Sequence, residues 1–310
     1  MRGRSSSVGL VLLWFCSLMI GGAAGLRICS YNIQKFNKNK AANYRVMHTL
    51  TKIVSRCDIC VLQDVVDPKL EAVKVLVASL NRSNKRYDEH HYEYLSSQSL
   101  GKASDDLEQY VFIYRTHLVK RLDQHQYEGK AFVRPPFAVH FSCNKTDIKK
   151  FVLVPLHTDP DHAVQEIDWL YDVFEEVSAK WNNTNVMFLG DFHAGCAYVT
   201  RDDKKNIRLF TNSNFSWLIG DREDTTVTDL TNCPYDRIVV HGQSFLQGIR
   251  PDSANVFNFG KEFRLRQAKV LLLSEHYPIE VRLKGSAPLL QAAPLLVLFS
   301  AIIRFFLPAL

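Results

Sequence analysis

The chain has 310 residues, of which 46% are hydrophobic and 23% charged, and that length is enough for one well-buried domain. It holds no Pro/Gly/Ser-rich linker, internal repeat or low-complexity tract, which excludes a repeat protein and a pair of tethered domains. The net charge of +6 favours an anionic partner such as nucleic acid or a membrane surface, although lysines and arginines are spread along the chain as on an ordinary solvated surface.

The first segment has the layout of a secretory signal peptide. Arg2 and Arg4 make a basic start, Val8–Ile20 is an apolar run, and the small residues Ala23–Gly25 follow it. A membrane anchor is the alternative, but the apolar run is short for a membrane span. We therefore predict a signal peptide over residues 1–25 and a mature chain that begins at Leu26.

Strand-like runs rich in β-branched and aromatic residues come next along the chain. They are Arg27–Ile33, Cys57–Val65, Tyr110–Arg115, Phe137–Ser142, Phe151–Leu156, Val186–Asp191, Arg237–His241 and Tyr277–Leu283. Several are apolar on both faces, as strands are when both sides of their sheet are covered.

Apolar residues at helical spacing predict helices within Val46–Val54, Leu70–Leu80 and Val164–Val177. We interpret these stripes as core faces that carry no chemistry. Strands that alternate with helices indicate an α/β protein, and two packed sheets with helices outside them would accommodate the many strands. This domain is predicted over residues 26–285.

The last segment resembles a signal for GPI attachment. Small residues at Gly285–Ala287 precede an almost wholly apolar run, Pro288–Leu310, that ends the sequence. A retained tail anchor and a merely cleaved end are the alternatives, because the polar spacer is short and Arg304 interrupts the run. We expect residues 286–310 to be the attachment signal, which would place the protein in the secretory pathway and then at the cell surface or outside the cell.

Sequons and cysteines agree with passage through the secretory pathway. Glycosylation sequons begin at Asn81, Asn144, Asn182 and Asn214. Cys16 would leave with the signal peptide, and the remaining cysteines would enter an oxidising compartment that permits disulfides. Their spacing alone does not pair them.

Polar residues of catalytic type recur at the ends of the predicted strands. They are Asn32, Asp64, Glu108, His157, Asp191, Asp236, Glu275 and His276. A single one of them would more often be a turn, a cap or a structural histidine. Side chains at strand ends of an α/β sheet converge on one rim, however, so the whole set predicts a site.

The chemistry of this set suits hydrolysis of a phosphodiester. Carboxylate oxygens bind Mg²⁺, Mn²⁺ or Ca²⁺, and a histidine oriented by a carboxylate can take a proton from water near neutral pH. A second pair of histidine and acid can protonate the leaving oxygen. Other sites fit less well, because no Cys/His spacing for zinc, no G-x-S-x-G elbow and no phosphate-binding loop is present. The Cys57–Cys60 C-x-x-C lies in an apolar strand and is not expected to be a redox motif.

Ordered blocks across the mature chain resemble the deoxyribonuclease I family of the endonuclease/exonuclease/phosphatase superfamily. The blocks are Ser30–Gln34, Val61–Val65, Tyr110–Arg115, Pro155–Thr158, Leu189–His193, Tyr235–Arg237 and Ser274–Pro278. The apolar tail makes the chain most similar to the membrane-anchored member of the family. The resemblance implies a four-layer α/β sandwich, with two packed mixed β-sheets flanked by helices. It also implies an endonuclease that cleaves DNA with little sequence specificity, using Mg²⁺ or Mn²⁺ with Ca²⁺ in a supporting role.

The resemblance also implies roles for individual residues. His157 with Glu108 and His276 with Asp236 are the expected acid–base pairs. The expected metal ligands are Asn32, Asp64, Asp191 and Glu275. Arg134 is the expected phosphate contact, and Cys196 with Cys233 is the expected disulfide. DNA is the expected partner and the protein is expected to be a monomer; nothing in the sequence speaks to actin binding.

The chain departs from the family pattern at three of these positions. Asp64 stands where the family has Glu, and Glu275 stands where it has Asp. A shift of about 1 Å at a catalytic centre can cost 100-fold in rate, although the two changes could compensate if both residues reach one ion.

The third departure is His193, which stands where the family has Asn. A neutral imidazole could bind a softer metal such as Mn²⁺ or Zn²⁺, whereas a protonated one could contact the phosphate and favour mildly acidic pH. The alternative is an impaired site. The competing functions are therefore a pseudo-nuclease that binds nucleic acid or protein, and a phosphodiesterase of another substrate such as phosphoinositides.

Overall fold

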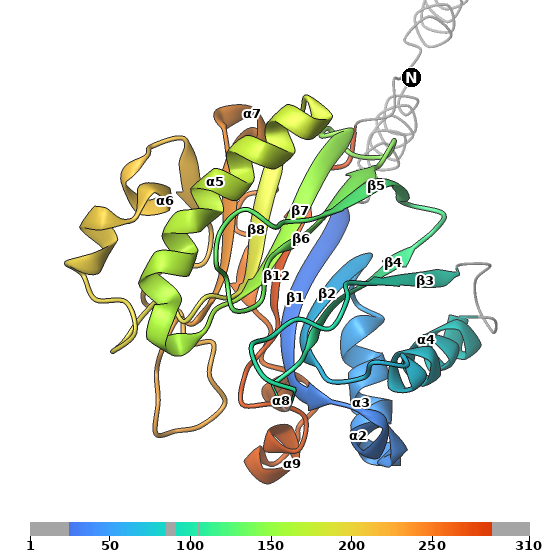
Figure 1. Ribbon diagram of the computed structural model, residues 1–310. Coiled ribbons are helices and arrows are strands. Elements are labelled where there is room, and N and C mark those ends of the chain that lie inside the picture. The colour runs from blue at the N-terminus through green and yellow to red at the C-terminus, as the bar shows by residue number, and fades with distance from the viewer. Residues whose placement is uncertain (1–24, 85–90, 105, 287–310) are drawn as a thin grey trace, which may run out of the picture.

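The computed structural model describes residues 25–84, 91–104 and 106–286 and confirms the predicted α/β sandwich (Figure 1). These residues form two six-stranded sheets that pack face to face. The predicted signal peptide and almost all of the predicted attachment signal lie outside the described residues. Within the described ranges, no helix has the length and apolar character needed to cross a bilayer.

The first sheet has the strand order β11-β12-β1-β2-β4-β3. Its strands are β1 (Leu26–Phe36), β2 (Ile59–Val65), β3 (Tyr92–Ser96), β4 (Gln109–Arg115), β11 (Asn255–Val256) and β12 (Ile279–Leu283). β1 pairs with β2 in parallel and with β12 in antiparallel fashion, so the sheet is mixed.

The second sheet has the order β5-β6-β7-β8-β10-β9. Its strands are β5 (Lys120–Gln126), β6 (Phe137–Ser142), β7 (Lys150–His157), β8 (Val186–Asp191), β9 (Phe215–Trp217) and β10 (Asp236–His241). β7 and β8 are parallel and the other pairs are antiparallel. The predicted bounds of β6 and β8 match the structure.

Helices cover the outer faces of both sheets. The α-helices are α2 (Lys38–Ala42), α3 (Tyr44–Val54), α4 (Glu71–Asn84), α5 (Ala163–Trp181), α6 (Arg208–Thr211), α7 (Gln243–Gly248), α8 (Phe259–Glu262) and α9 (Gln267–Leu271). One core cluster joins α3, α4, α8 and α9 to the first sheet, and another joins α5 and α6 to the second. A third cluster fills the space between the sheets. The molecule therefore has four layers.

The alternation of side chains in β1 shows why apolar residues occur on both faces of this strand. Leu26 and Ile28 belong to the core between the sheets, whereas Cys29 and Tyr31 belong to the core under the helices. Successive residues of a strand point to opposite faces, and here both faces are covered. The edge strand β5, by contrast, is mostly exposed, and its polar sequence is the reason that sequence patterns did not predict it.

Two facing irregularities shape the carboxyl ends of β1 and β2. The pairing shifts between Asn32 and Phe36, and Gln34, Lys35 and Asp64 all have positive φ values, of 45°, 50° and 55°. Bulges of this kind re-aim side chains and are common next to active sites. The Nζ atom of Lys40 donates to the carbonyls of Ile33 and Gln34, at 2.8 and 2.5 Å, and so holds the bulge from the α2 side.

The two described ends of the chain lie together, at the opposite end of the sheet from this bulge. Leu26 at the start of β1 pairs with Leu283 near the end of β12, and Ser30 pairs with Ile279. Asn32, which follows in β1, and His276, which precedes β12, therefore lie at the other end of the same strand pair. The strand ends that carry polar residues form one rim, as predicted.

The structure contains two disulfides among the described residues. Cys196 pairs with Cys233, as the family resemblance implies. Cys29 pairs with Cys57, a bridge that was not predicted, and it removes Cys57 from the C-x-x-C sequence. Cys60 and Cys143 are buried and free.

Candidate active site

Asp191 is the centre of a polar cluster on the rim. It is the last residue of β8, its side chain is 1% exposed, and its Oδ2 accepts a hydrogen bond of 3.0 Å from Nδ2 of Asn32 on β1. This hydrogen bond joins the two sheets, because it links the carboxyl-terminal part of β1 to the carboxyl end of β8. The preceding residue, Gly190, has a φ of 149°, and a Cβ there would lie 2.0 Å from the Leu156 carbonyl oxygen. A glycine is therefore required at position 190, immediately before Asp191 in β8.

His157 lies beside Asp191 because the parallel register of β7 and β8 pairs these two residues. Its Nδ1 is 2.7 Å from Oε1 of Glu108, which immediately precedes β4 of the opposite sheet. Its backbone N–H donates to the hydroxyl of Tyr110, at 3.0 Å. With Nδ1 occupied by the carboxylate, the Nε2 atom of His157 is turned toward Asp191, at 3.7 Å from Oδ2.

His276 forms a second pair of the same kind. Its Nδ1 is 2.8 Å from Oδ2 of Asp236, the first residue of β10. The Ser274 hydroxyl donates to the carbonyl of Asn32 at 2.6 Å and accepts the N–H of His276 at 3.0 Å. The Nε2 atom of His276 lies 3.4 Å from Oδ2 of Asp191. The structure therefore brings both predicted acid–base pairs to one carboxylate oxygen.

Both histidines have a raised proton affinity. Burial lowers the pKa of His157, but the charges of Glu108 and Asp191 outweigh burial and raise it to about 9. In the same way, Asp236 and Asp191 outweigh burial and raise the pKa of His276 to about 10. Burial also raises the pKa of Glu108 and of Asp236, so each pair binds its proton tightly.

The pKa of Asp191 is shifted in the opposite direction, to a lower value. Burial alone would raise its pKa, but the neighbouring imidazoles and the Asn32 amide outweigh burial and hold the pKa of Asp191 well below its usual range. The site therefore combines a fixed anion with two protonated imidazoles. Such an arrangement can attract a phosphate and donate a proton to it.

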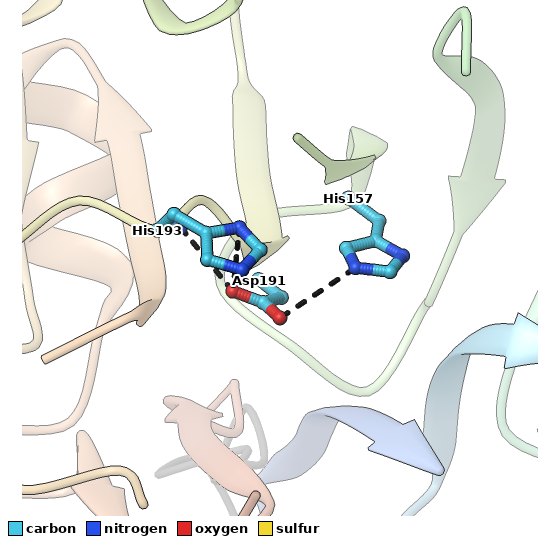
Figure 2. A group of neighbouring side chains, drawn as sticks. All are labelled: His157, Asp191 and His193. Carbon is cyan, nitrogen blue, oxygen red and sulfur yellow. Dashed lines mark hydrogen bonds and ion pairs between the residues drawn. The ribbon is translucent and has the colours of Figure 1, made fainter. Parts of the chain in front are cut away.

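His193 lies on the other side of the Asp191 carboxylate from His157 (Figure 2). Its Nδ1 is 3.4 Å from Oδ1 of Asp191 and 3.0 Å from the hydroxyl of Thr158. Burial, only partly opposed by Asp191, lowers the pKa of His193 to about 4. The neutral imidazole is thus the favoured form near neutral pH. Its backbone φ of 46° is a left-handed conformation that Asn, Asp and His adopt more readily than other residues.

Arg134 reaches the site from the loop before β6. Its Nε is 3.1 Å from Oε1 of Glu108, and its Nη2 is 3.1 Å from Asp106. Tyr110 also donates its hydroxyl to the Arg134 carbonyl, at 3.0 Å. The residue is 7% exposed, and its Nη1 has no hydrogen-bond partner within the described part of the chain. The guanidinium is positioned next to the Glu108–His157 pair, where its Nε makes an ion pair but, like Nη1, no hydrogen bond to a described residue.

The four predicted metal ligands are not all in mutual contact. Asn32 and Asp191 contact each other directly. Asp64 is half-buried at the end of β2, and its charge acts on both Glu108 and Lys40. Glu275 is exposed, and its backbone N–H donates to Oε1 of Gln34. The predicted ligands thus supply oxygen donors at the rim, and oxygen donors of this kind suit a divalent cation.

Several residues that hold the site were not predicted. They are Tyr110, Thr158, Glu166, Thr225 and Ser274. Tyr110, Thr158 and Ser274 lie within the family blocks, which was a signal that they matter. Thr225 accepts the N–H of Asp236 at 3.1 Å, and Glu166 is buried in the first turn of α5. Nothing in the local sequence distinguishes these last two from ordinary loop and helix residues.

Comparisons with known proteins place the chain among nucleases. Residues 29–258 match the endonuclease/exonuclease/phosphatase family. Deoxyribonuclease gamma of Rattus norvegicus is 41% identical over 275 residues, covering 87% of this chain and 88% of that protein. Deoxyribonuclease-1-like 1 of Mus musculus is 41% identical over 283 residues, covering 91% and 87%.

Solved structures show the same fold at low sequence identity. The catalytic domain of human Nocturnin with bound sulfate aligns with a TM-score of 0.55 at 11% identity, covering 84% of this chain and 95% of that one. A Bacteroides thetaiotaomicron endonuclease/exonuclease/phosphatase family protein aligns with a TM-score of 0.55 at 16% identity, covering 84% and 97%.

Proposed function

The chain belongs to the deoxyribonuclease I family and is a deoxyribonuclease, and from that premise we propose that it is a Mg²⁺- or Mn²⁺-dependent endonuclease that works at the cell surface or outside the cell. The observation that carries the proposed chemistry is the meeting of two imidazoles at one carboxylate oxygen. Nε2 of His157 and Nε2 of His276 lie 3.7 and 3.4 Å from Oδ2 of Asp191. Each imidazole is held through Nδ1 by its own acid.

These two nitrogens can serve the two ends of a hydrolysis. A phosphodiester bound between them needs one group to take a proton from the attacking water and another to give a proton to the leaving oxygen. Both imidazoles are protonated at neutral pH in the cation-free protein, so one of them has to lose its proton before its Nε2 can take the first proton. Glu108 or Asp236 then stabilises the imidazolium that forms. Nε2 of the other, which is protonated at neutral pH, supplies the second. The geometry is nearly symmetric, so either histidine can fill either role.

Arg134 and the oxygen donors complete the proposed phosphate site. The guanidinium of Arg134, which lies beside Glu108, would donate to a non-bridging phosphate oxygen. Asn32, Asp64 and Asp191 would hold the catalytic cation. When bound, the cation neutralises charge on the phosphate and lowers the proton affinity of the nearby imidazole. Ca²⁺ would support the structure, and phosphate contacts would leave little sequence specificity.

The fold also suits attachment at the carboxyl end. The described ends of the chain lie at the start of β1 and the end of β12, opposite to the catalytic rim. An anchor added near Gly285 or Ser286 would therefore direct the rim away from the membrane, toward DNA in solution. Release of the protein from intact cells by a phospholipase specific for GPI anchors would support this location. Retention on the cells after that treatment would contradict it.

Nicking of a supercoiled plasmid tests the activity. We expect nicked circles to precede linear DNA with Mg²⁺ or Mn²⁺, and no cutting with a chelator. His157→Ala should slow nicking by about 100-fold or more, because it removes a proton-transfer group. His48→Ala, an exposed histidine on α3, is the matched control and should cut at the wild-type rate. A wild-type protein no faster than His157→Ala would instead identify a pseudo-nuclease that binds DNA without cutting it.

A further inference from the structure

His193 gives this chain a set of metal ligands that an asparagine at the same position cannot supply. The ligand atoms of His157, Asp191 and His193 all lie within 4.8 Å of one another. Figure 2 shows the carboxylate of Asp191 between the two imidazoles. We propose that these three residues form a binding site for a transition-metal ion of the Zn²⁺ or Co²⁺ class, and that the bound ion turns the nuclease off.

The donor types select the kind of ion. Two imidazole nitrogens and one carboxylate oxygen are typical ligands of Zn²⁺ and Co²⁺, whereas Mg²⁺ and Ca²⁺ prefer oxygen donors. Zinc sites with three protein ligands keep a further position for water or another ligand. The Asp191 carboxylate can serve here because Oδ1 faces His193, at 3.4 Å, while Oδ2 faces His157, at 3.7 Å.

Both imidazoles are already oriented for this role. Nδ1 of His157 is paired with Oε1 of Glu108, so Nε2 is the nitrogen that faces Asp191, and its long contact of 3.5 Å with Nδ2 of Asn32 would be exchanged for the metal. A carboxylate behind a metal-bound histidine is a common arrangement that fixes the ring and strengthens the ligand. Nδ1 of His193 is the atom that faces Asp191, and the Thr158 hydroxyl beside it can rotate away when a metal takes the nitrogen lone pair.

The ring of His193 is held in place by its neighbours. It lies nearly parallel to the His157 ring, with an interplanar angle of 16° and 6.0 Å between the centroids. The rings of Tyr198 and Tyr235 pack against it, at 5.1 and 5.4 Å. The backbone N–H of His193 also donates to Oδ1 of Asp191, at 3.2 Å. Ligands held in this way need little reorganisation to bind a metal.

The consequence for catalysis follows from one shared atom. Nε2 of His157 is both the proposed metal ligand and the proposed proton-transfer group. A nitrogen bound to Zn²⁺ has no lone pair for a proton, so occupancy of this site and catalysis exclude each other. This consequence depends on the proposed function, but metal binding itself does not.

Metal binding is tested first without any activity measurement. The purified wild-type protein, freed of metal by dialysis, should bind one Co²⁺ with visible ligand-field absorption, and Zn²⁺ should displace it. His193→Asn should weaken Co²⁺ binding by about 100-fold or more, because even the outer partners of metal ligands are worth 10–100-fold. His48→Asn should bind as the wild type does. Equal affinity in wild type and His193→Asn would overturn the proposal.

Anomalous diffraction keeps the proposal testable if a variant fails to fold. Crystals of the wild-type protein grown with Zn²⁺ should show an anomalous peak between His157, Asp191 and His193, and a peak only elsewhere would refute the site.

In the nicking assay with Mg²⁺, added Zn²⁺ should inhibit the wild type, and inhibition of His193→Asn should need about 100-fold more Zn²⁺. Equal inhibition of both proteins would reject the switch but leave the nuclease intact. An inactive wild type would refute the proposed function instead.

Discussion

Oε1 of Glu166 accepts a hydrogen bond of 2.7 Å from the backbone N–H of Val133. Glu166 is fully buried on α5, and its other oxygen accepts the N–H of Asp159, at 3.0 Å. One carboxylate thus holds two loops, the one that carries Arg134 and the one that follows His157. Burial raises the pKa of Glu166, and the two N–H donors partly oppose that rise. A buried charged side chain is in this case a positioning device for the site.

Replacement of this carboxylate tests the positioning role. In Glu166→Gln one of the two N–H groups meets an NH₂ group instead of an acceptor, and an unsatisfied buried donor costs about 1–3 kcal/mol. We expect the free energy of unfolding, measured with urea, to fall by that amount and plasmid nicking to slow. Glu175→Gln, an exposed change on the same helix, is the control. Equal stability and activity of the two variants would contradict the role assigned to Glu166.

The raised pKa values of His157 and His276 predict a loss of stability on the alkaline side. The folded pKa values are about 9 and about 10, against an unfolded value of 6.5. Between these limits the folded protein binds more protons than the unfolded chain, so the free energy of unfolding falls as pH rises. The contribution is complete below pH 6.5. Urea unfolding in chelator from pH 6.5 to 9 measures the slope, which should flatten when both histidines are replaced by Asn.

The lowered pKa of His193 predicts the opposite dependence on the acidic side. Its folded value is about 4, below the unfolded value of 6.5. Here the unfolded chain binds more protons, so the free energy of unfolding decreases as pH falls from 6.5 toward 4. His193→Asn should lose part of this acid sensitivity in chelator, whereas the exposed His48→Asn should keep it. An unchanged acid slope in His193→Asn would show that the imidazole is not held neutral.

Gly190 is expected to tolerate no side chain. A Cβ there would meet the Leu156 carbonyl oxygen at 2.0 Å, and the φ of 149° is strained for any other residue. Gly190→Ala should lower the free energy of unfolding by about 3 kcal/mol and displace Asp191 from its neighbours. At Gly220 the nearest atom to an added Cβ is 4.0 Å away, so Gly220→Ala is the matched control. Similar melting temperatures for the two variants would argue against the close approach.

The strands that sequence patterns predicted correctly are those buried on both faces. β6 and β8 match at both ends because their apolar runs begin and end with the strand. β3, β5, β9 and β11 were missed. β5 reads Lys120–Gln126 and is polar and mostly exposed, so only its pairing with β6 makes it a strand. The helices α6 to α9 are too short for their apolar residues to show a helical period, so sequence patterns did not predict them.

The candidate site shows the same division. The chemical types of His157, His276, Asp191 and their acids could be read from their positions after apolar runs and from the family blocks. Their pairing was implied only by the family resemblance and not by any local pattern, because Glu108 and His157 lie 49 residues apart in sequence and are positioned by strands of different sheets. The bridge between Cys29 and Cys57 was missed for a similar reason. Cys57 precedes β2, and the register of β1 beside β2 pairs Cys29 with Cys60, so neither the spacing nor the strand pairing indicates this disulfide.

By itself, the sequence determined the fold class, the family and the residue types at the rim, because strand and helix periodicity and short ordered motifs are local properties of a chain. The tertiary structure alone decided that Asp191 would face three imidazoles at once and that His193 would be held neutral beside it. Those outcomes depend on distances between strands of two packed sheets and on how completely water is excluded there. Neither quantity is encoded in any single stretch of residues.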